Sequence, residues 1–168
     1  MTCSPCLRDM TQLTIISVGT LKEDYLRAAV AEYEKRLSAF CRVENVTVKE
    51  ERIPDESDET AIKAALRAEG ERILSRVPQG AYTMALCIEG EMPDSVGLSK
   101  KIGRAIDAGG KLCLIIGSSH GLSDEVKRAA RERVSFSRLT FPHQLMRVIL
   151  LEAVYRSFRI LTGGNYHK

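Results

Sequence analysis

The chain has 168 residues, a length typical of one domain with a sizeable buried core. Its composition, 44% hydrophobic and 28% charged, is ordinary for a globular protein, and its net charge of +3 is compatible with an RNA partner without indicating one. No apolar run is long enough to cross a bilayer, and the first ten residues lack the apolar core of a signal peptide, so we expect a cytoplasmic protein.

Cysteine usage favours a reducing compartment. The five cysteines are an odd number, and two of them lie inside apolar runs. Cys3 and Cys6 form a C-x-x-C motif, but no second pair completes a zinc site, so we expect no metal centre. Residues 1–9 are expected to be a disordered extension before a single domain of residues 10–168.

The first half of the chain predicts two strands and two helices. Residues 13–18 form a β-rich run, and residues 22–40 carry apolar side chains at helical spacing. Residues 43–48 alternate between apolar and polar side chains, as in a half-buried strand. The acidic segment 50–60 is expected to be a loop, and residues 61–77 to be a second helix.

The second half continues the alternation of strands and helices. Residues 81–88 and 111–116 are almost continuously apolar, as expected of central parallel strands buried on both faces. Helices are predicted at residues 98–108 and 122–133, and a short strand at residues 134–136. The whole pattern predicts an α/β fold with a mainly parallel sheet flanked by helices. Ligands of such sheets bind at the carboxyl ends of the strands, which directs attention to the loops that follow them.

The C-terminal segment predicts a long helix. Thr140 is a plausible capping residue, Pro142 lies near the first helical position, and Gly163 and Gly164 end the helix. The roughly twenty residues between them are apolar nearly all round, so more than one side of the helix must be covered. We expect the protein's own sheet on one side and a second subunit on the other.

The turn GSSHG at residues 117–121 has two interpretations. It lacks the spacing of a dinucleotide fingerprint and the lysine of a P-loop, which favours an ordinary strand-to-helix turn that needs glycine. Gly117 would nevertheless allow a ligand to approach the backbone closely, because it has no Cβ. By the same reasoning, His120 is expected to be a solvent-facing turn residue.

Charged side chains on the predicted helices are also ambiguous. The basic groups within residues 100–104 and 127–133 are more often solvated faces than RNA footprints. His143 and Arg147 share one face of the last helix, and so do Glu152 and Arg156. Spacing alone leaves open whether Glu152 and Arg156 form an intrahelical pair or take part in function.

Four segments of the chain together resemble a known family. They are ISVGTLKEDY and AEYEKRL in the first half, and FSRLTFPHQLMRV and GGNYHK near the C-terminus. In these segments the chain resembles the bacterial ribosomal RNA large subunit methyltransferase H family, whose members are S-adenosyl-L-methionine-dependent enzymes of the SPOUT superfamily. The resemblance extends over nearly the whole chain from about Met10.

The resemblance implies a specific fold and activity. The α/β fold would contain a C-terminal trefoil knot, in which the last helix threads a loop. The protein would be a homodimer whose active site is completed by the partner's C-terminal tail. The reaction would be methylation of N3 of one pseudouridine of 23S rRNA in assembled ribosomes. A SPOUT enzyme acting on another RNA, such as tRNA, and a non-catalytic ribosome-binding factor are the alternatives.

The resemblance also assigns residues. The positions that would contact S-adenosyl-L-methionine are Leu86, Gly117, Phe136, Ser137, Arg138, Leu139, Thr140 and Phe141. The catalytic group would comprise His167, which removes the N3 proton or orients the base, together with Tyr166 and Arg147. Residues expected to bind RNA or orient the tail are His143, Arg156 and Lys168.

Two positions depart from the family pattern. Ser118 stands where the family usually has a second glycine, and Glu91 stands where it usually has a lysine.

Overall fold

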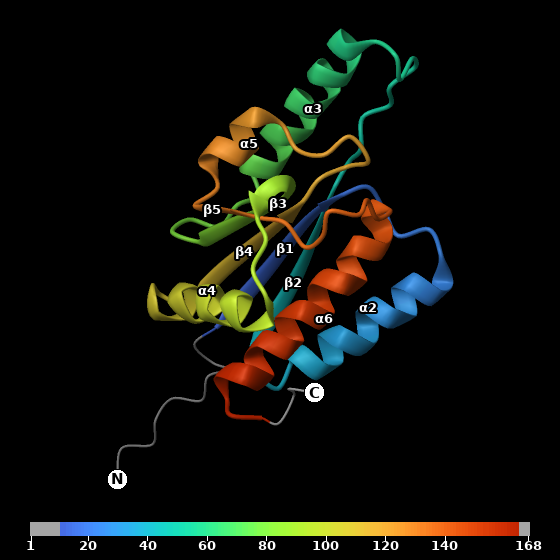
Figure 1. Cartoon of the computed structure of the whole chain (residues 1–168). Helices are drawn as coiled ribbons and strands as arrows, with labels where there is room; N and C mark the ends of the chain where they lie inside the picture. The colour runs from blue at the N-terminus through green and yellow to red at the C-terminus, as the bar shows by residue number, and fades with distance from the viewer. Residues whose placement is uncertain (1–10, 165–168) are drawn as a thin grey trace.

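A computed structural model describes residues 11–164 of the chain (Figure 1). Five strands form one sheet in the order β2-β1-β4-β3-β5, and every neighbouring pair is parallel. The strands are β1 (Gln12–Val18), β2 (Arg42–Val48), β3 (Tyr82–Glu91), β4 (Lys111–Ile116) and β5 (Glu132–Val134). The predicted α/β fold with a parallel sheet is therefore confirmed.

Helices cover both faces of the sheet, which gives three layers (Figure 1). One face carries α2 (Asp24–Leu37), α4 (Ser95–Asp107) and α6 (His143–Leu161), and the other carries α3 (Glu59–Leu74) and α5 (Asp124–Ala129). The central strands β1 and β4 are buried on both faces, which explains their continuous apolar sequences. No helix within residues 11–164 has the length and apolar character needed to span a membrane.

The predicted element boundaries need correction around β3 and β5. Strand β3 continues to Glu91 instead of ending at residue 88, and its pairing with β5 shifts register between Leu86 and Glu91. The main chain packs so closely there that a Cβ on Gly90 would lie 2.6 Å from the Val134 nitrogen. Tertiary pairing, which local sequence does not encode, therefore extends the strand.

The predicted helix at residues 122–133 was too long. Helix α5 ends at Ala129, because Ala130 is already extended and the Arg131 N–H donates to the Thr83 carbonyl at 3.0 Å. Strand β5 therefore lies two residues earlier than predicted. As a consequence, Ser135 and Phe136 belong to the loop that follows it.

Helix α6 ends as predicted but begins differently. Gly163, at φ +74°, donates its N–H to the Ile160 carbonyl, and the Gly164 N–H donates to the Arg159 carbonyl at 2.8 Å. At the other end Pro142 is the capping residue, without a side-chain hydrogen bond, so the prediction of Thr140 as the cap was wrong.

Much of the apolar surface of α6 is covered within one chain. The helix packs on the sheet and against both α2 and α4, and Phe158 is completely buried. Leu145 and Leu161 stay more than a third exposed, near opposite ends of the helix. The trefoil knot stays a prediction, since strand order alone does not define how α6 passes the loops beside it.

Candidate functional site

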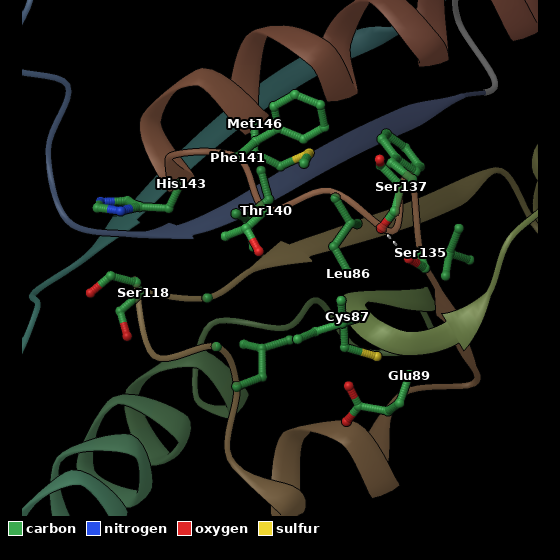
Figure 2. Close-up of a pocket in the computed structure, with 18 of the residues that line it drawn as sticks. Leu86, Cys87, Glu89, Ser118, Ser135, Ser137, Thr140, Phe141, His143 and Met146 are labelled. Atoms are coloured by element: carbon green, nitrogen blue, oxygen red, sulfur yellow. Dashed lines mark hydrogen bonds between the residues drawn. The ribbon is translucent and has the colours of Figure 1, made fainter.

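A cavity of about 270 Å³ opens at the carboxyl ends of the strands (Figure 2). Its walls come from the end of β3, the loop after β4, the loop after β5 and the first turn of α6. Segments far apart in the sequence meet here because parallel strands end at the same edge of the sheet. The three loops singled out from the sequence are thus brought together.

The loop after β4 is a tight turn that depends on two glycines. Gly121 adopts φ +89° and donates its N–H to the Ser118 carbonyl at 3.0 Å. A Cβ on Gly117 would overlap the Gly121 carbonyl, so the turn itself requires glycine at this position. This supports the structural interpretation of the GSSHG motif. The same turn nevertheless forms part of the cavity wall, and His120 lines the cavity instead of facing only solvent.

The loop after β5 is braced by its own serines. The Ser135 N–H donates to the Glu91 carbonyl at 2.8 Å, and the Ser135 hydroxyl donates to the Ser137 carbonyl at 3.2 Å. The Ser137 hydroxyl accepts the Leu139 N–H at 2.9 Å. These bonds fix the path of a segment that has no regular secondary structure.

Most of the predicted cofactor-contacting positions line this cavity. The lining includes Leu86, Gly117, Phe136, Ser137, Leu139, Thr140 and Phe141. Arg138 is exposed and does not line the cavity, although it belongs to the same loop. The sequence identified the correct loops, but it gave no means of telling that Arg138, within one of them, does not line the cavity.

Several lining residues were missed by sequence reasoning. Cys87, Ile88 and Glu89 continue β3 along the wall, and Lys127 and Met146 contribute from α5 and α6. Figure 2 labels Cys87, Glu89 and Met146 among them. Ser118, Ser119 and Leu122 contribute from the loop after β4. Position beside the ends of predicted strands was the signal for the residues of β3 and of the loop after β4, whereas no signal pointed to Lys127 and Met146 inside their helices.

Glu89 and Lys127 form an ion pair in the wall, with 2.5 Å between carboxylate and ammonium. The hydrogen bond from Lys127 lowers the pKa of Glu89. Next to them, burial raises the pKa of the Cys87 thiol, so this cysteine is mostly protonated at neutral pH. The wall therefore combines fixed charge with a weakly nucleophilic thiol.

His143 and Arg147 share a helix face but have different surroundings. His143 lines the cavity, half-buried, and burial lowers its pKa despite the nearby carboxylate of Glu50. Arg147 is 8% exposed and does not line this cavity; its guanidinium donates to the carbonyls of Val18 and Gly19 at the end of β1. Its Nε is buried without a hydrogen bond to any described residue.

Glu152 and Arg156 form an ion pair of 2.7 Å along α6. The pairing interpretation is therefore confirmed, while a part in RNA binding stays a prediction. Tyr166, His167 and Lys168 lie outside the described residues, as do Cys3, Cys6 and the predicted extension 1–9. Among residues 11–164, no cluster of histidine, cysteine or acidic side chains could hold a metal ion.

The cavity is chemically suited to a nucleoside with a charged extension. Leu86, Leu122 and Phe136 offer apolar surface for a flat base. Hydroxyls of Ser118 and Thr140 and the carboxylate of Glu89 lie in the same lining and can meet polar or cationic groups. S-Adenosyl-L-methionine combines these features, so the residues present fit the cofactor that the resemblance implies.

Solved structures support the fold. A probable methyltransferase from Bordetella pertussis superposes with a TM-score of 0.57 over 89% of this chain and 95% of its own, at 10% identity. A second structure, described as giving insight into methylation of C/U34 on tRNA, superposes with a TM-score of 0.51 over 91% of this chain and 98% of its own, at 17% identity. At such low identity these similarities show the fold alone.

Sequence comparison identifies the family. A family model described as "Predicted SPOUT methyltransferase" matches residues 11–167. The protein named ribosomal RNA large subunit methyltransferase H from Bacillus pumilus is 47% identical over 93% of this chain and 99% of its own length. The protein of that name from Listeria monocytogenes is 45% identical over the same shares. The chain therefore belongs to the SPOUT methyltransferase family, within the group named ribosomal RNA large subunit methyltransferase H.

Proposed function

We propose that this protein transfers the methyl group of S-adenosyl-L-methionine to N3 of one pseudouridine of 23S rRNA in assembled ribosomes. Relatives that are 41–47% identical over nearly their whole length carry the corresponding name. The observation that carries the proposal is the convergence of the three loops on one cavity. Such a protein would work in the cytoplasm, where its ribosomal substrate is found.

We assign the cofactor to this cavity. Leu86 and Phe136 would pack on the adenine, and the main chain of the serine-braced loop 135–141 would meet the polar edge of the base. Glu89, held in its charged form by Lys127, would offer a carboxylate oxygen to polar groups of the cofactor, although the ion pair as a whole adds no net charge to the wall.

The reaction is a direct displacement. The cofactor supplies an electrophilic methyl on a positively charged sulfur; a bond forms from N3 to this carbon while the carbon–sulfur bond breaks, so positioning provides much of the rate. The N3 proton must leave to a group within hydrogen-bond reach. His167, with Tyr166 beside it, is the proposed group. Arg147 would act indirectly, by holding the end of β1 beneath the first turn of α6.

The length of α6 supports a homodimer with shared active sites. His143 lies in the cavity, at the start of α6. At the other end of the helix, the Gly164 N–H donates to the Arg159 carbonyl, and Arg159 is sixteen positions after His143, or about 24 Å along the helix axis. His167 lies only three positions after Gly164 in the sequence, so the segment between them spans at most about 11 Å. A tail of that length would be too short to bring His167 to the cavity of its own protomer, whereas a partner's tail would be free to enter it.

The proposed activity is tested with labelled S-adenosyl-L-methionine and ribosomes from a strain that lacks this gene. We expect label in one pseudouridine of 23S rRNA, located by mass mapping, and no label with His167→Ala. Label in tRNA instead would establish another substrate. Absence of cofactor binding in calorimetry would establish a non-catalytic factor.

Sharing of active sites is tested by mixing two impaired variants, at a cofactor concentration well below the dissociation constant of Gly117→Ala, where that variant has little activity. Gly117→Ala damages the cavity and His167→Ala damages the tail, so a heterodimer of the two keeps one intact site. Random pairing would restore about a quarter of the wild-type activity, since half of the dimers are mixed and each has one working site. No recovery, with mixed dimers shown by mass spectrometry, would contradict a site made from two chains.

A further inference from the structure

Glu69 on α3 is a buried carboxyl group that lies behind the cavity wall. It is 2% exposed, and its Oε1 accepts the Glu51 N–H at 2.9 Å. Its Oε2 is buried and makes no hydrogen bond of normal geometry with any described residue. A buried carboxylate oxygen without a partner is costly, so such an atom calls for a structural or functional reason.

The polar side chain that approaches the Glu69 carboxyl group is that of Ser118. Burial raises the pKa of Glu69, while the Glu51 N–H and the Ser118 hydroxyl act in the opposite direction. Ser118 is itself buried and belongs to the tight turn that lines the cavity.

Helix α3 is held against the same turn at a second point. A Cβ on Gly70 would overlap the Ser123 hydroxyl, which accepts the Val126 N–H and begins α5. Two consecutive residues of α3 thus contact the two ends of the segment 118–123. Close packing at Gly70 fixes the distance at which Glu69 faces the turn.

The other side of Glu69 is also anchored. Arg72, one turn further along α3, pairs with the Glu51 carboxylate and donates to the Lys49 carbonyl at 3.0 Å. The loop after β2 is therefore fastened to α3 by both Arg72 and Glu69. Glu69 consequently connects the turn to the loop after β2, which is itself held in place by Arg72. Its carboxyl group is therefore not free to follow Ser118 if the turn moves.

We propose that Glu69 is a positioning residue for the cofactor cavity: its free carboxylate oxygen accepts the Ser118 hydroxyl when cofactor is bound and fixes the turn at residues 117–121. The inference rests on the proposed cofactor site. It assigns to Glu69 no contact with the cofactor and no proton transfer. A residue of this kind changes how well the cavity is preorganised and leaves the chemical step unaltered.

The test compares Ser118→Ala, Glu69→Ala, Glu69→Gln and the double alanine variant. We expect each alanine change to raise the dissociation constant of S-adenosyl-L-methionine on the order of tenfold, and the double variant to be no weaker than the single ones. The KM for the cofactor should rise while kcat stays within about twofold. Glu69→Gln should bind nearly as the wild type, because the amide can accept from Glu51 and donate to the Ser118 oxygen.

Glu71→Ala is the matched control, since Glu71 lies on the same helix but pairs only loosely with Arg67 at the surface, and its dissociation constant should equal that of the wild type. Unchanged cofactor binding in Ser118→Ala, or effects of the two alanine changes that multiply, would overturn the inference even if Glu69→Ala fails to fold. A wild-type protein that binds no cofactor would instead overturn the proposed function.

Discussion

Lys127 on α5 and Glu89 on β3 form an ion pair in the cavity wall, with 2.5 Å between Nζ and Oε1. Neither residue was itself predicted as a site residue, although Glu89 directly follows the predicted strand 81–88. The pair links an α-helix to the irregular end of β3, where the register with β5 shifts. It therefore stabilises the part of the wall that regular sheet pairing supports least.

The Glu89–Lys127 pair should contribute measurably to stability. In a double-mutant cycle with Glu89→Gln and Lys127→Gln, we expect a coupling of about 0.5–1 kcal/mol in the free energy of unfolding, measured with urea at pH 7. Since the pKa of folded Glu89 lies below its usual 4.5, this contribution is present above pH 4.5 and is lost as the pH falls through the folded value.

The exposed pair of Arg67 and Glu71, at 3.7 Å, is the control for that cycle and should show coupling near zero. Equal coupling energies for the two pairs would mean that the position of Glu89 and Lys127 in the cavity wall adds no stability beyond that of an exposed ion pair.

Gly117→Ala should damage the cavity. The added methyl group overlaps the Gly121 carbonyl, so the turn must open at a cost of about 1–3 kcal/mol. We expect the affinity for S-adenosyl-L-methionine, measured by calorimetry, to fall on the order of tenfold or more. Gly103→Ala on α4 is the control: its Cβ meets only the flexible end of Leu161, and helix propensity favours alanine. Wild-type affinity in Gly117→Ala would show that the turn does not shape the cofactor site.

Cys87 should report cofactor binding by its rate of alkylation. After Cys3 and Cys6 are changed to serine, Cys87 is the accessible thiol, because burial raises the pKa of Cys41 and Cys113 to about 12. Iodoacetamide should modify it slowly, and faster as the pH rises, since its own pKa is raised.

Saturating S-adenosyl-L-methionine should slow that modification several-fold, as followed by mass spectrometry, because Cys87 lines the cavity. Protein unfolded in urea provides the comparison, since the cofactor should not protect its thiols. Equal rates in the folded protein with and without cofactor would place the binding site elsewhere.

His143 should make the protein less stable in mild acid. Burial lowers the pKa of the folded imidazole, so below the unfolded value of 6.5 protons bind the unfolded chain preferentially. Stability should fall as the pH decreases from 6.5 through the folded value, and His143→Gln should flatten this dependence in urea titrations between pH 7 and pH 5. His120→Gln, which removes the other imidazole of the cavity lining, is the control. An unchanged profile in His143→Gln would show that another group carries the acid sensitivity.

The sequence predicted the parts of the fold that local patterns encode. Strand β4 matches its prediction residue for residue, because the five apolar side chains in a row after Lys111 fit a fully buried strand. Gly163 ended α6 as predicted, because a positive φ at that position favours glycine. The length of β3 and the early end of α5 were not predictable, because pairing with β5 and the hydrogen bond from Arg131 to Thr83 decide them.

The candidate site likewise divides into parts that the sequence predicts and parts that only tertiary contacts decide. The loops were predictable from the strand ends, and the resemblance supplied Leu86, Gly117, His143 and most of the lining residues of the loop after β5. The burial of Arg147 was not predictable, since its spacing from His143 shows a shared face but not that the guanidinium turns to the β1 carbonyls. Glu69 gave no signal, because nothing in the sequence places an acidic residue of α3 behind Ser118.

The serine-braced loop 135–141 directly follows the shortest strand of the sheet. Strand β5 has three residues, lies at the sheet edge and pairs, within residues 11–164, with β3 alone. Local opening of an edge strand this short costs far less than global unfolding, so the amides of residues 132–141 should be among the first in the sheet region to exchange with solvent. A ligand that bridges this loop and β4 would convert the least protected part of the sheet into a protected one, and hydrogen exchange there would measure occupancy of the cavity directly.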